Sequence, residues 1–317
     1  MAATHGIYVV ADIHGSEVCW RKFLNAARFY GVDTVIVAGD VTGKALVPIV
    51  ERRDGRHEAR IAGRVQSARD EAGVAELESR IRINGFYPYR CAEAEYERLE
   101  AEPAHRDRVF TDVMAATLRD WLRLADERLA GTGIRALVMP GNDDGAYVDD
   151  VLAESAEVVN TDGRVIDLPE FQVLGFGPSN RTPWNTHREL DEPDIATRLA
   201  ALEAGLDPTK PTVVVAHVPP YGSRLDVAPL LRPDLSIVIE GGEPVMVPVG
   251  STAVHDFLER LQPVLSLHGH IHESRGATRI GRTLAVNPGS SYSTGALLGA
   301  IITLRKGSVV SHQLVAG

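Results

Sequence analysis

The sequence contains few of the residues that mark several common protein classes. Its 317 residues include only two cysteines, Cys19 and Cys91, whose spacing matches no metal motif and no disulfide framework. This usage favours a reducing compartment. No stretch approaches the roughly 18 consecutive apolar residues that a membrane-spanning helix needs. The first residues form neither the basic nor the apolar part of a signal peptide, so we expect a cytoplasmic protein with no membrane partner.

The chain also lacks a basic excess. Lysine and arginine total 33 against 43 acidic residues, which gives a formal net charge of −10. A protein that binds nucleic acid through bulk charge needs the opposite balance, so a nucleic-acid partner is disfavoured. The hydrophobic fraction of 44% and the charged fraction of 24% are typical of a globular protein. Whether the chain forms a homo-oligomer is left open by the sequence.

The N-terminal region predicts an α/β fold. Ile7–Ala11 is a short apolar run of the kind that forms a buried strand. Ser16 is suited to cap a following helix that Gly31 would end. Thr34–Ala38 is a second apolar run, so the order is strand, helix, strand. This order favours parallel strands with helices packed on the sheet.

A charged segment then interrupts the pattern. Residues 51–108 include 12 arginines and 13 acidic residues. Asp54-Gly55 is a turn signal that predicts a hairpin, and we expect charged helices at about 66–83 and 93–102. A further amphipathic helix is predicted near 109–130. We therefore expect one domain over residues 1–317 with a charged, mainly helical insertion at about 45–108.

Polar side chains with metal-binding atoms follow the apolar strands. Later strands are predicted at Arg135–Met139, Phe171–Phe176, Thr212–Ala216 and Pro263–Leu267. Because ligands bind beyond the carboxyl ends of the strands in open α/β sheets, groups far apart in sequence can meet at one edge. The candidate metal ligands are Asp12, His14, Asp40, Asn142, His217, His270 and His272.

The chemistry of this set points to two metal ions. Two carboxylates, four imidazoles and one amide oxygen are too many ligands for one ion, and they suit two ions that share a carboxylate. Mixed nitrogen and oxygen ligands without thiolate favour Mn, Fe, Zn or Ni over Mg or Ca, and we expect Mn first. Two ions about 3.5–4 Å apart can generate a hydroxide near neutral pH and hold the oxygens of an in-line displacement at phosphorus.

The sequence blocks ADIHG, AGDVTG, PGNDD, VVVAHVPP and HGHIHES resemble, in order, those of the calcineurin-like metallophosphoesterase superfamily. Further motifs, such as VNPGS, are similar to those of an Icc-related subgroup of predicted phosphoesterases. The resemblance implies a β-sandwich core flanked by helices, with the metals at its rim. It also implies one metal held by Asp12, His14 and His272, a second held by Asn142, His217 and His270, and Asp40 as the bridge.

The sequence departs from the superfamily pattern at Asp143. Many members have a histidine after the asparagine, where it donates a proton to the leaving group. We expect Asp143 instead to orient a histidine ligand or a metal-bound water. His187, His255 and His268 are open alternatives for the leaving-group acid. The loop after Phe171–Phe176 reaches toward the same edge, so Asn180 and Arg181 are candidate substrate contacts.

The expected function is hydrolysis of a small phosphate ester, with a phosphodiester preferred, by in-line attack of a metal-bridging hydroxide. Asp40, Asn142 and Asp143 are the expected catalytic residues. The alternatives are a phosphomonoesterase and a catalytically weak, metal-stabilised binding scaffold. A Ser/Thr protein phosphatase is disfavoured, because the resemblance would require different residues around Asp40 and Asn142.

Overall fold

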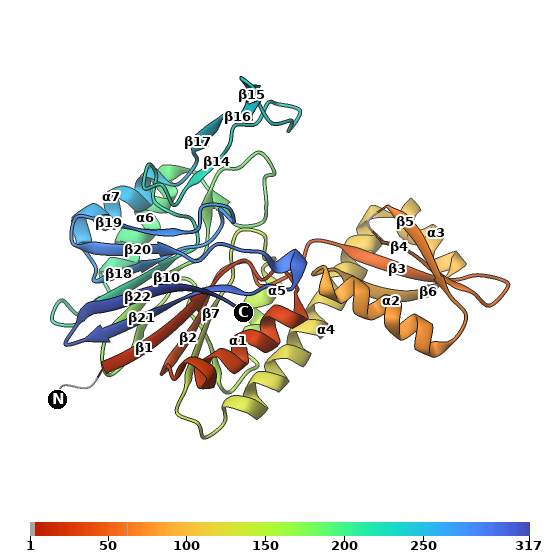
Figure 1. The fold of residues 1–317 in the computed structure, drawn as a ribbon, viewed down its shortest axis with the longest axis horizontal. Helices are drawn as coiled ribbons and strands as arrows, with labels where there is room; N and C mark the ends of the chain where they lie inside the picture. Colours follow the sequence, from red (N-terminus) through yellow and green to blue (C-terminus); the bar gives the residue numbers. More distant parts are fainter. Residues whose placement is uncertain (1–3, 62) are drawn as a thin grey trace.

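Two mixed β-sheets pack face to face and carry helices on their outer surfaces (Figure 1). The computed structural model describes residues 4–61 and 63–317. The first sheet has the order β22-β21-β1-β2-β7-β8. Its strands are β1 (Thr4–Val10), β2 (Thr34–Ala38), β7 (Arg135–Met139), β8 (Val158–Asn160), β21 (Leu298–Arg305) and β22 (Ser308–Ala316). Within it, β1, β2, β7 and β8 run parallel to one another.

The second sheet has the order β19-β20-β18-β13-β10-β9. Its strands are β9 (Val165–Asp167), β10 (Gln172–Phe176), β13 (Thr212–Ala216), β18 (Leu265–Leu267), β19 (Gly276–Ile280) and β20 (Thr283–Asn287). Here β10, β13, β18 and β20 are parallel. In both sheets, the carboxyl ends of the parallel strands and the loops that follow them therefore lie at one rim of the sandwich.

Alternating side chains divide the core into three layers. In β1, Ile7 and Val9 point into the core between the sheets, where they meet Val173 and Val215 of the second sheet. The intervening residue Tyr8 points to the outer layer instead. That outer layer is closed by α1 (Glu17–Tyr30), α4 (Pro103–Leu129) and α5 (Tyr147–Leu152). Helices α6 (Glu192–Glu203) and α7 (Thr252–Leu261) cover the other side. The predicted β-sandwich flanked by helices is confirmed.

Local sequence signals set the start and end of the first helix. Ser16 accepts a hydrogen bond from the Cys19 backbone N–H, and Gly31 ends α1 in the left-handed conformation, with φ of 64°. Both predictions are confirmed. The amphipathic helix predicted near 109–130 is also present, but it begins earlier, because Pro103 at its first turn lets α4 start directly after α3 (Glu93–Ala101).

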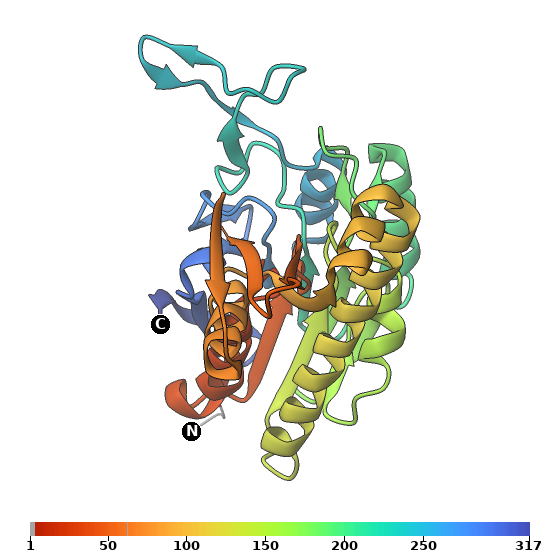
Figure 2. The same cartoon turned by 90° about the vertical axis from the view of Figure 1, so that its right-hand side faces the viewer.

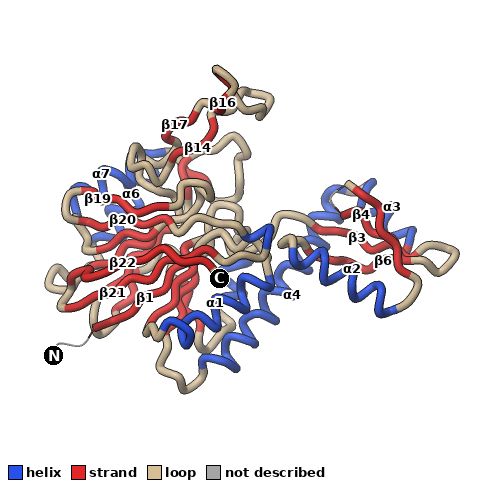
Figure 3. Tube along the Cα trace, in the orientation of Figure 1, coloured by secondary structure: helices blue, strands red, loops and turns tan. Residues whose placement is uncertain are grey.

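The insertion differs from its prediction. The hairpin at Asp54-Gly55 and the two charged helices are present, but the segment also forms a four-stranded sheet with the order β5-β4-β3-β6 (Figures 1 and 3). It is therefore a mixed α/β unit rather than mainly helical. Its elements are β3 (Leu46–Glu51), β4 (His57–Ile61), β5 (Arg64–Ala68), α2 (Glu71–Ile83), β6 (Tyr87–Ala92) and α3. The hairpin accounts for β3 and β4, whereas β5 and β6 were not expected, because only Ala68 of β5 is buried and β6 contains Pro88.

A second segment extends away from the sandwich beside the same rim (Figure 2). It comprises residues 227–248, which we call the arm, and it contains two small hairpins. Their strands are β14 (Val227–Pro229), β15 (Ile239–Glu240), β16 (Glu243–Pro244) and β17 (Met246–Pro248). The remaining short elements are β11 (Ser179–Asn180), β12 (Glu189–Leu190) and the 3₁₀ turn η1 (Tyr292–Thr294). No helix in the described residues is long and apolar enough to cross a membrane.

Candidate metal centre

The loops that follow five parallel strands meet at one rim of the sandwich. β1, β2 and β7 of the first sheet, and β13 and β18 of the second, each end beside this point. The structure thus brings together all seven predicted ligands, which come from positions up to 260 residues apart in the chain. They are Asp12, His14, Asp40, Asn142, His217, His270 and His272.

Several of these residues have a backbone conformation that favours glycine. Asp12, His14, Asp40 and His270 have φ values of 54°, 40°, 54° and 67°. Such conformations cost on the order of 1–3 kcal/mol each and persist only where the surroundings enforce them. Here the backbone N–H of His14 donates to the carbonyl of Asp40, at 3.0 Å, so the loops after β1 and β2 hold each other. Four of the nine non-glycine residues with positive φ in the described part of the chain are candidate ligands.

Glycines allow the side chains of the cluster to approach the neighbouring backbone. A Cβ atom at Gly39 would lie 2.0 Å from Nδ1 of His217, and one at Gly141 would lie 2.3 Å from Oδ1 of Asp40. Real Cβ atoms do not approach other heavy atoms so closely. The glycines beside Asp40 and Asn142 in the sequence blocks therefore have a packing role as well as a turn role.

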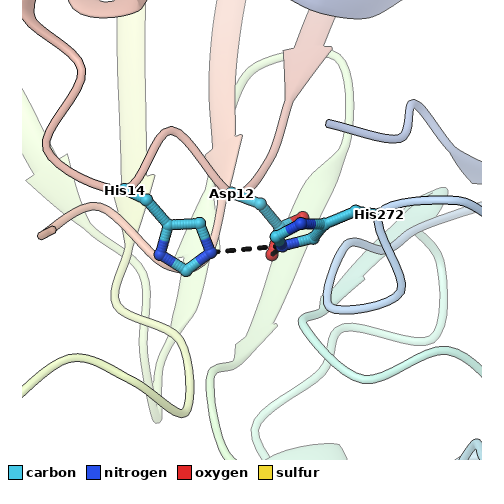
Figure 4. Close-up of side chains that lie close together, drawn as sticks. All are labelled: Asp12, His14 and His272. Atoms are coloured by element: carbon cyan, nitrogen blue, oxygen red, sulfur yellow. Dashed lines mark hydrogen bonds and ion pairs between the residues drawn. The ribbon is translucent and has the colours of Figure 1, made fainter. Parts of the chain in front are cut away.

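The first part of the cluster contains Asp12, His14 and His272 (Figure 4). Nε2 of His14 lies 3.2 Å from Nε2 of His272, and Oδ1 of Asp12 lies 3.4 Å from the same His272 atom. Two ligand atoms that are each about 2.1 Å from one ion are separated by roughly 3.0–3.4 Å at octahedral or tetrahedral angles. The side chains therefore already have the spacing of ligands around a single ion.

The second part of the cluster is centred on the amide oxygen of Asn142. This oxygen lies 3.0 Å from Nε2 of His217 and 2.7 Å from Nδ1 of His270. Oδ2 of Asp40 lies between the two parts, 3.6 Å from Nε2 of His14 and 3.4 Å from Nε2 of His217. The residues thus fit two ions that share the Asp40 carboxylate, with nitrogen and oxygen donors only.

A buried carboxylate that the sequence analysis did not identify holds the loops around this cluster. Asp144 is fully buried and accepts hydrogen bonds from the backbone N–H groups of Val41, Thr42 and Gly141 at 2.8–2.9 Å. Burial and the charge of Asp40 raise the pKa of Asp144 to about 6. Its contacts join the loops after β2 and β7, which carry Asp40 and Asn142.

The VNPGS segment forms hydrogen bonds to the backbone of two loops that carry candidate ligands. The side-chain amide of Asn287 donates to the carbonyl of Ile271 at 2.9 Å, which fixes the loop between His270 and His272. Oγ of Ser290 donates to the carbonyl of Asp12 at 2.7 Å. On the opposite side, Nδ1 of His217 lies 2.7 Å from the carbonyl of Ala38, an arrangement that leaves Nε2 free to face the cluster.

Asp143 forms an ion pair that the sequence analysis missed. Its Oδ2 lies 2.7 Å from Nζ of Lys44, and its backbone N–H donates to Oδ1 of Asp40 at 3.0 Å. Burial and the charge of Asp40 raise the pKa of Asp143, whereas the ion pair with Asp143 raises the pKa of Lys44 against the effect of burial. The available signal was a lysine four positions after Asp40 in a chain that has few lysines.

The insertion packs directly against the loop that carries Lys44. The backbone N–H of Gly43 donates to the Tyr87 hydroxyl at 2.9 Å, and a Cβ at Gly43 would lie 2.2 Å from the carbonyl of Gly85. Gly85 in turn lies against the carbonyl of His14, which would be 2.4 Å from a Cβ there. The base of the insertion therefore helps to position both loops of the first sheet that carry candidate ligands.

A cleft of about 900 Å³ opens above the cluster. Asp40, Asn142, His270 and His272 form part of its lining, together with Lys44 and Asp143. Its other walls come from α4, the loop at 181–187 and the arm. A site of this size can admit a drug-sized or nucleotide-sized molecule.

The remaining predicted residues separate into those at the cleft and those away from it. Arg181 and His187 line the cleft, although Nε of Arg181 also pairs with Asp191 at 2.8 Å. Asn180 instead donates to the Val249 carbonyl at 3.2 Å and does not line the described cleft. The Asn180 side chain links its loop to the backbone at the base of the arm. A direct contact between Asn180 and substrate is therefore not supported.

Two of the three histidines considered as leaving-group acids lie outside the cleft. His268 is fully buried, and its ring bonds the Ser266 hydroxyl at 2.8 Å and the Ala216 carbonyl at 2.8 Å. Burial lowers the pKa of His268 to about 4. It is a core histidine and does not line the cleft. His255 bonds the Tyr221 carbonyl and lies outside the cleft, which leaves His187 as the one of the three that lines it.

Electrostatics divide the four candidate histidine ligands into two pairs in the metal-free protein. Burial lowers the pKa of His14 to about 3 and that of His270 to about 4. Burial would also lower the pKa of His217, but the carboxylates of Asp40 and Asp12 raise it to about 10. The Asp12 carboxylate likewise raises the pKa of His272 against the effect of burial. A proton on His217 therefore occupies a position that a metal ion would take.

Comparison with known proteins gives the fold of this chain. No known family profile matches the sequence. An uncharacterized protein of Methanocaldococcus jannaschii, MJ1162, is 31% identical over 157 residues, which are 49% of this chain and 64% of the relative. TT1561 of Thermus thermophilus has a solved structure that aligns with a TM-score of 0.54 and 14% identity over 99% of both chains. The calcineurin-like phosphoesterase YfkN of Bacillus subtilis aligns with a TM-score of 0.44 and 12% identity over 100% of this chain and 91% of that one. The chain thus shares the overall fold of TT1561.

Metal binding is expected to release protons and to strengthen as pH rises. His217 has a pKa of about 10 and so carries a proton at neutral pH, which must leave before Nε2 can bind an ion. Apparent affinity for Mn²⁺ should therefore rise up to about tenfold per pH unit between about pH 7 and pH 9. Calorimetric titrations in buffers of different ionisation enthalpy measure the released protons. Affinity that is constant with pH, without proton release, would contradict this arrangement.

Proposed function

We propose that this chain is a calcineurin-like metallophosphoesterase, a metal-dependent hydrolase of phosphoric esters. One domain over residues 1–317 would carry out this function, with the segment at about 45–108 as an insertion. The observation that supports it most is the meeting of seven ligand-type side chains from five strand ends, at ligand spacing. Four of these side chains line a cleft of about 900 Å³. A fold alone would not support a function.

The proposed assignment of residues to the two ions follows the two parts of the cluster. Asp12, His14 and His272 would hold one ion, Asn142, His217 and His270 would hold the other, and Asp40 would contact both. Mn is the first choice, with Fe, Zn or Ni as alternatives, because the donors are nitrogen and oxygen without thiolate. When bound, two such ions lower the pKa of water and draw charge from phosphoryl oxygens.

The side chains above the cluster are suited to an anionic ester. Lys44 lines the cleft with its side chain half exposed, and Asp143 holds its ammonium group beside Asp40. This ammonium group can neutralise a phosphoryl oxygen without moving, because the ion pair fixes its position. Asp143 would act as the positioning residue for Lys44, and Asp40 and Asn142 would contribute to catalysis as ligands.

A small phosphodiester is the preferred substrate class, and a phosphomonoester is the main alternative. Asp143 also supports a second candidate function, a metal-stabilised binding scaffold with weak catalysis, because it is held by Lys44 and offers no ready proton. We propose the cytoplasm as the compartment and a small molecule, rather than nucleic acid, as the partner.

Hydrolysis should depend steeply on the acidity of the leaving group. Asp143 is held by Lys44 rather than free to donate a proton, so departure of the leaving oxygen is weakly assisted. Turnover of a series of aryl phosphodiesters should fall as the pKa of the leaving phenol rises. Rates that stay constant across the series would show that another acid, such as His187, protonates the leaving oxygen.

The proposed function predicts metal-dependent hydrolysis of bis-p-nitrophenyl phosphate in preference to p-nitrophenyl phosphate. Metal-stripped protein refilled with Mn²⁺ should be active, and His217→Ala or Asp40→Asn should lower turnover by roughly 10²-fold or more without unfolding the chain. His312→Ala, at an exposed position on β22, is the matched control and should keep full activity.

The outcomes of this assay separate the candidate functions. Turnover that favours the monoester would support a phosphomonoesterase. Near-wild-type activity of a folded His217→Ala variant would contradict the proposed site. Absence of turnover with Mn²⁺, Ni²⁺, Zn²⁺ or Fe²⁺, in a protein that still binds the metal, would favour the scaffold.

A further inference from the structure

One wall of the cleft carries a tryptophan that is open to solvent. Trp184 lies in the loop at 181–187, lines the cleft and is 61% exposed. We propose that Trp184 stacks on a planar aromatic group of the bound phosphate ester, a group with the chemistry of a nucleobase. This inference rests on the proposed function for the phosphate end of the ligand and adds the identity of its organic end.

The backbone of this loop is fixed, although the indole ring is exposed. The buried carboxylate of Glu189 accepts hydrogen bonds from the backbone N–H groups of Thr182 and Thr186, at 2.9 and 2.8 Å. The backbone N–H of Trp184 itself donates to Oγ1 of Thr182 at 3.2 Å. A ring presented from a fixed turn loses little conformational entropy when it binds a ligand.

The same loop is joined to a candidate metal ligand. Oγ1 of Thr186 accepts a hydrogen bond from Nδ2 of Asn142 at 2.8 Å, and the backbone N–H of Arg188 donates to the Asn142 carbonyl at 3.1 Å. Trp184 is two residues from Thr186. The backbone that carries its ring is therefore linked to the metal cluster, as a contact to the organic part of a phosphate ester requires.

Other apolar side chains line the same cleft as Trp184. Phe110 and Met114 come from α4, and Leu230, Leu231 and Val247 come from the arm, and all of them line the cleft with Trp184. Asn185 and His187 also line it and can hydrogen-bond the edge of a heterocycle. Apolar walls with a few polar groups beside a phosphate-binding centre fit a base better than they fit a bare sugar.

Tryptophan fluorescence can test this proposal independently of turnover. The chain has three tryptophans, and the other two, Trp20 and Trp121, are buried at 0% and 5% exposure. Quenching by acrylamide should therefore report on Trp184. In the Zn²⁺-loaded protein, AMP should protect this residue from acrylamide at about tenfold lower concentration than ribose 5-phosphate, which has the same phosphate and sugar but no base.

Variants separate stacking from general binding. Affinities measured by calorimetry should show that Trp184→Ala loses the roughly tenfold preference for AMP but binds ribose 5-phosphate as the wild type does, whereas Trp184→Phe keeps part of the preference. Phe29→Ala removes an aromatic ring that is 81% exposed on α1, away from the cleft lining, and serves as the matched control.

Each outcome distinguishes this inference from the proposed function. Equal affinity for AMP and ribose 5-phosphate, or a preference that survives in Trp184→Ala, would overturn the inference even if diesters are hydrolysed. Protection by n-octyl phosphate as strong as by AMP would also overturn it, because the wall would then accept any apolar group. A preference for AMP that depends on Trp184, in a protein without turnover, would support the inference and contradict the proposed function.

Discussion

The structure depends on the backbone hydrogen bonds that join the loops after β1 and β2. The N–H of Asp12 donates to the carbonyl of Gly39, and the N–H of His14 donates to the carbonyl of Asp40, both at 3.0 Å. These bonds hold three residues in left-handed conformations that would otherwise relax. They also place the carboxylates of Asp12 and Asp40 in one buried cluster, which is unfavourable without compensating positive charge.

Protons and metal ions are alternative sources of that positive charge. In the metal-free protein, a proton on His217 compensates the carboxylates, and this explains why its pKa is raised although the ring is buried. Two ions would provide the same compensation more strongly and would use the spacing that the side chains already have. Asp144 and the base of the insertion keep that spacing fixed, because they hold the surrounding loops by backbone contacts.

The sequence predicted the ligand cluster because each ligand follows a short apolar strand. The bounds expected for β2, β7 and β13 agree with the structure, and parallel strands direct their carboxyl ends to one edge. The roles of Lys44 and Asp144 could not be predicted in this way, since they arise from contacts between loops distant in sequence. The sheet of the insertion was predicted only as the hairpin of β3 and β4, because β5 has a single buried residue and β6 contains a proline.

Anomalous diffraction from crystals grown with Mn²⁺ would test the central claim most directly. The account predicts two metal peaks per chain, about 3.5–4 Å apart, with the Asp40 carboxylate in contact with both. Asp12, His14 and His272 should surround one peak, and Asn142, His217 and His270 the other. A single peak, or two peaks that lie away from these side chains, would contradict the account.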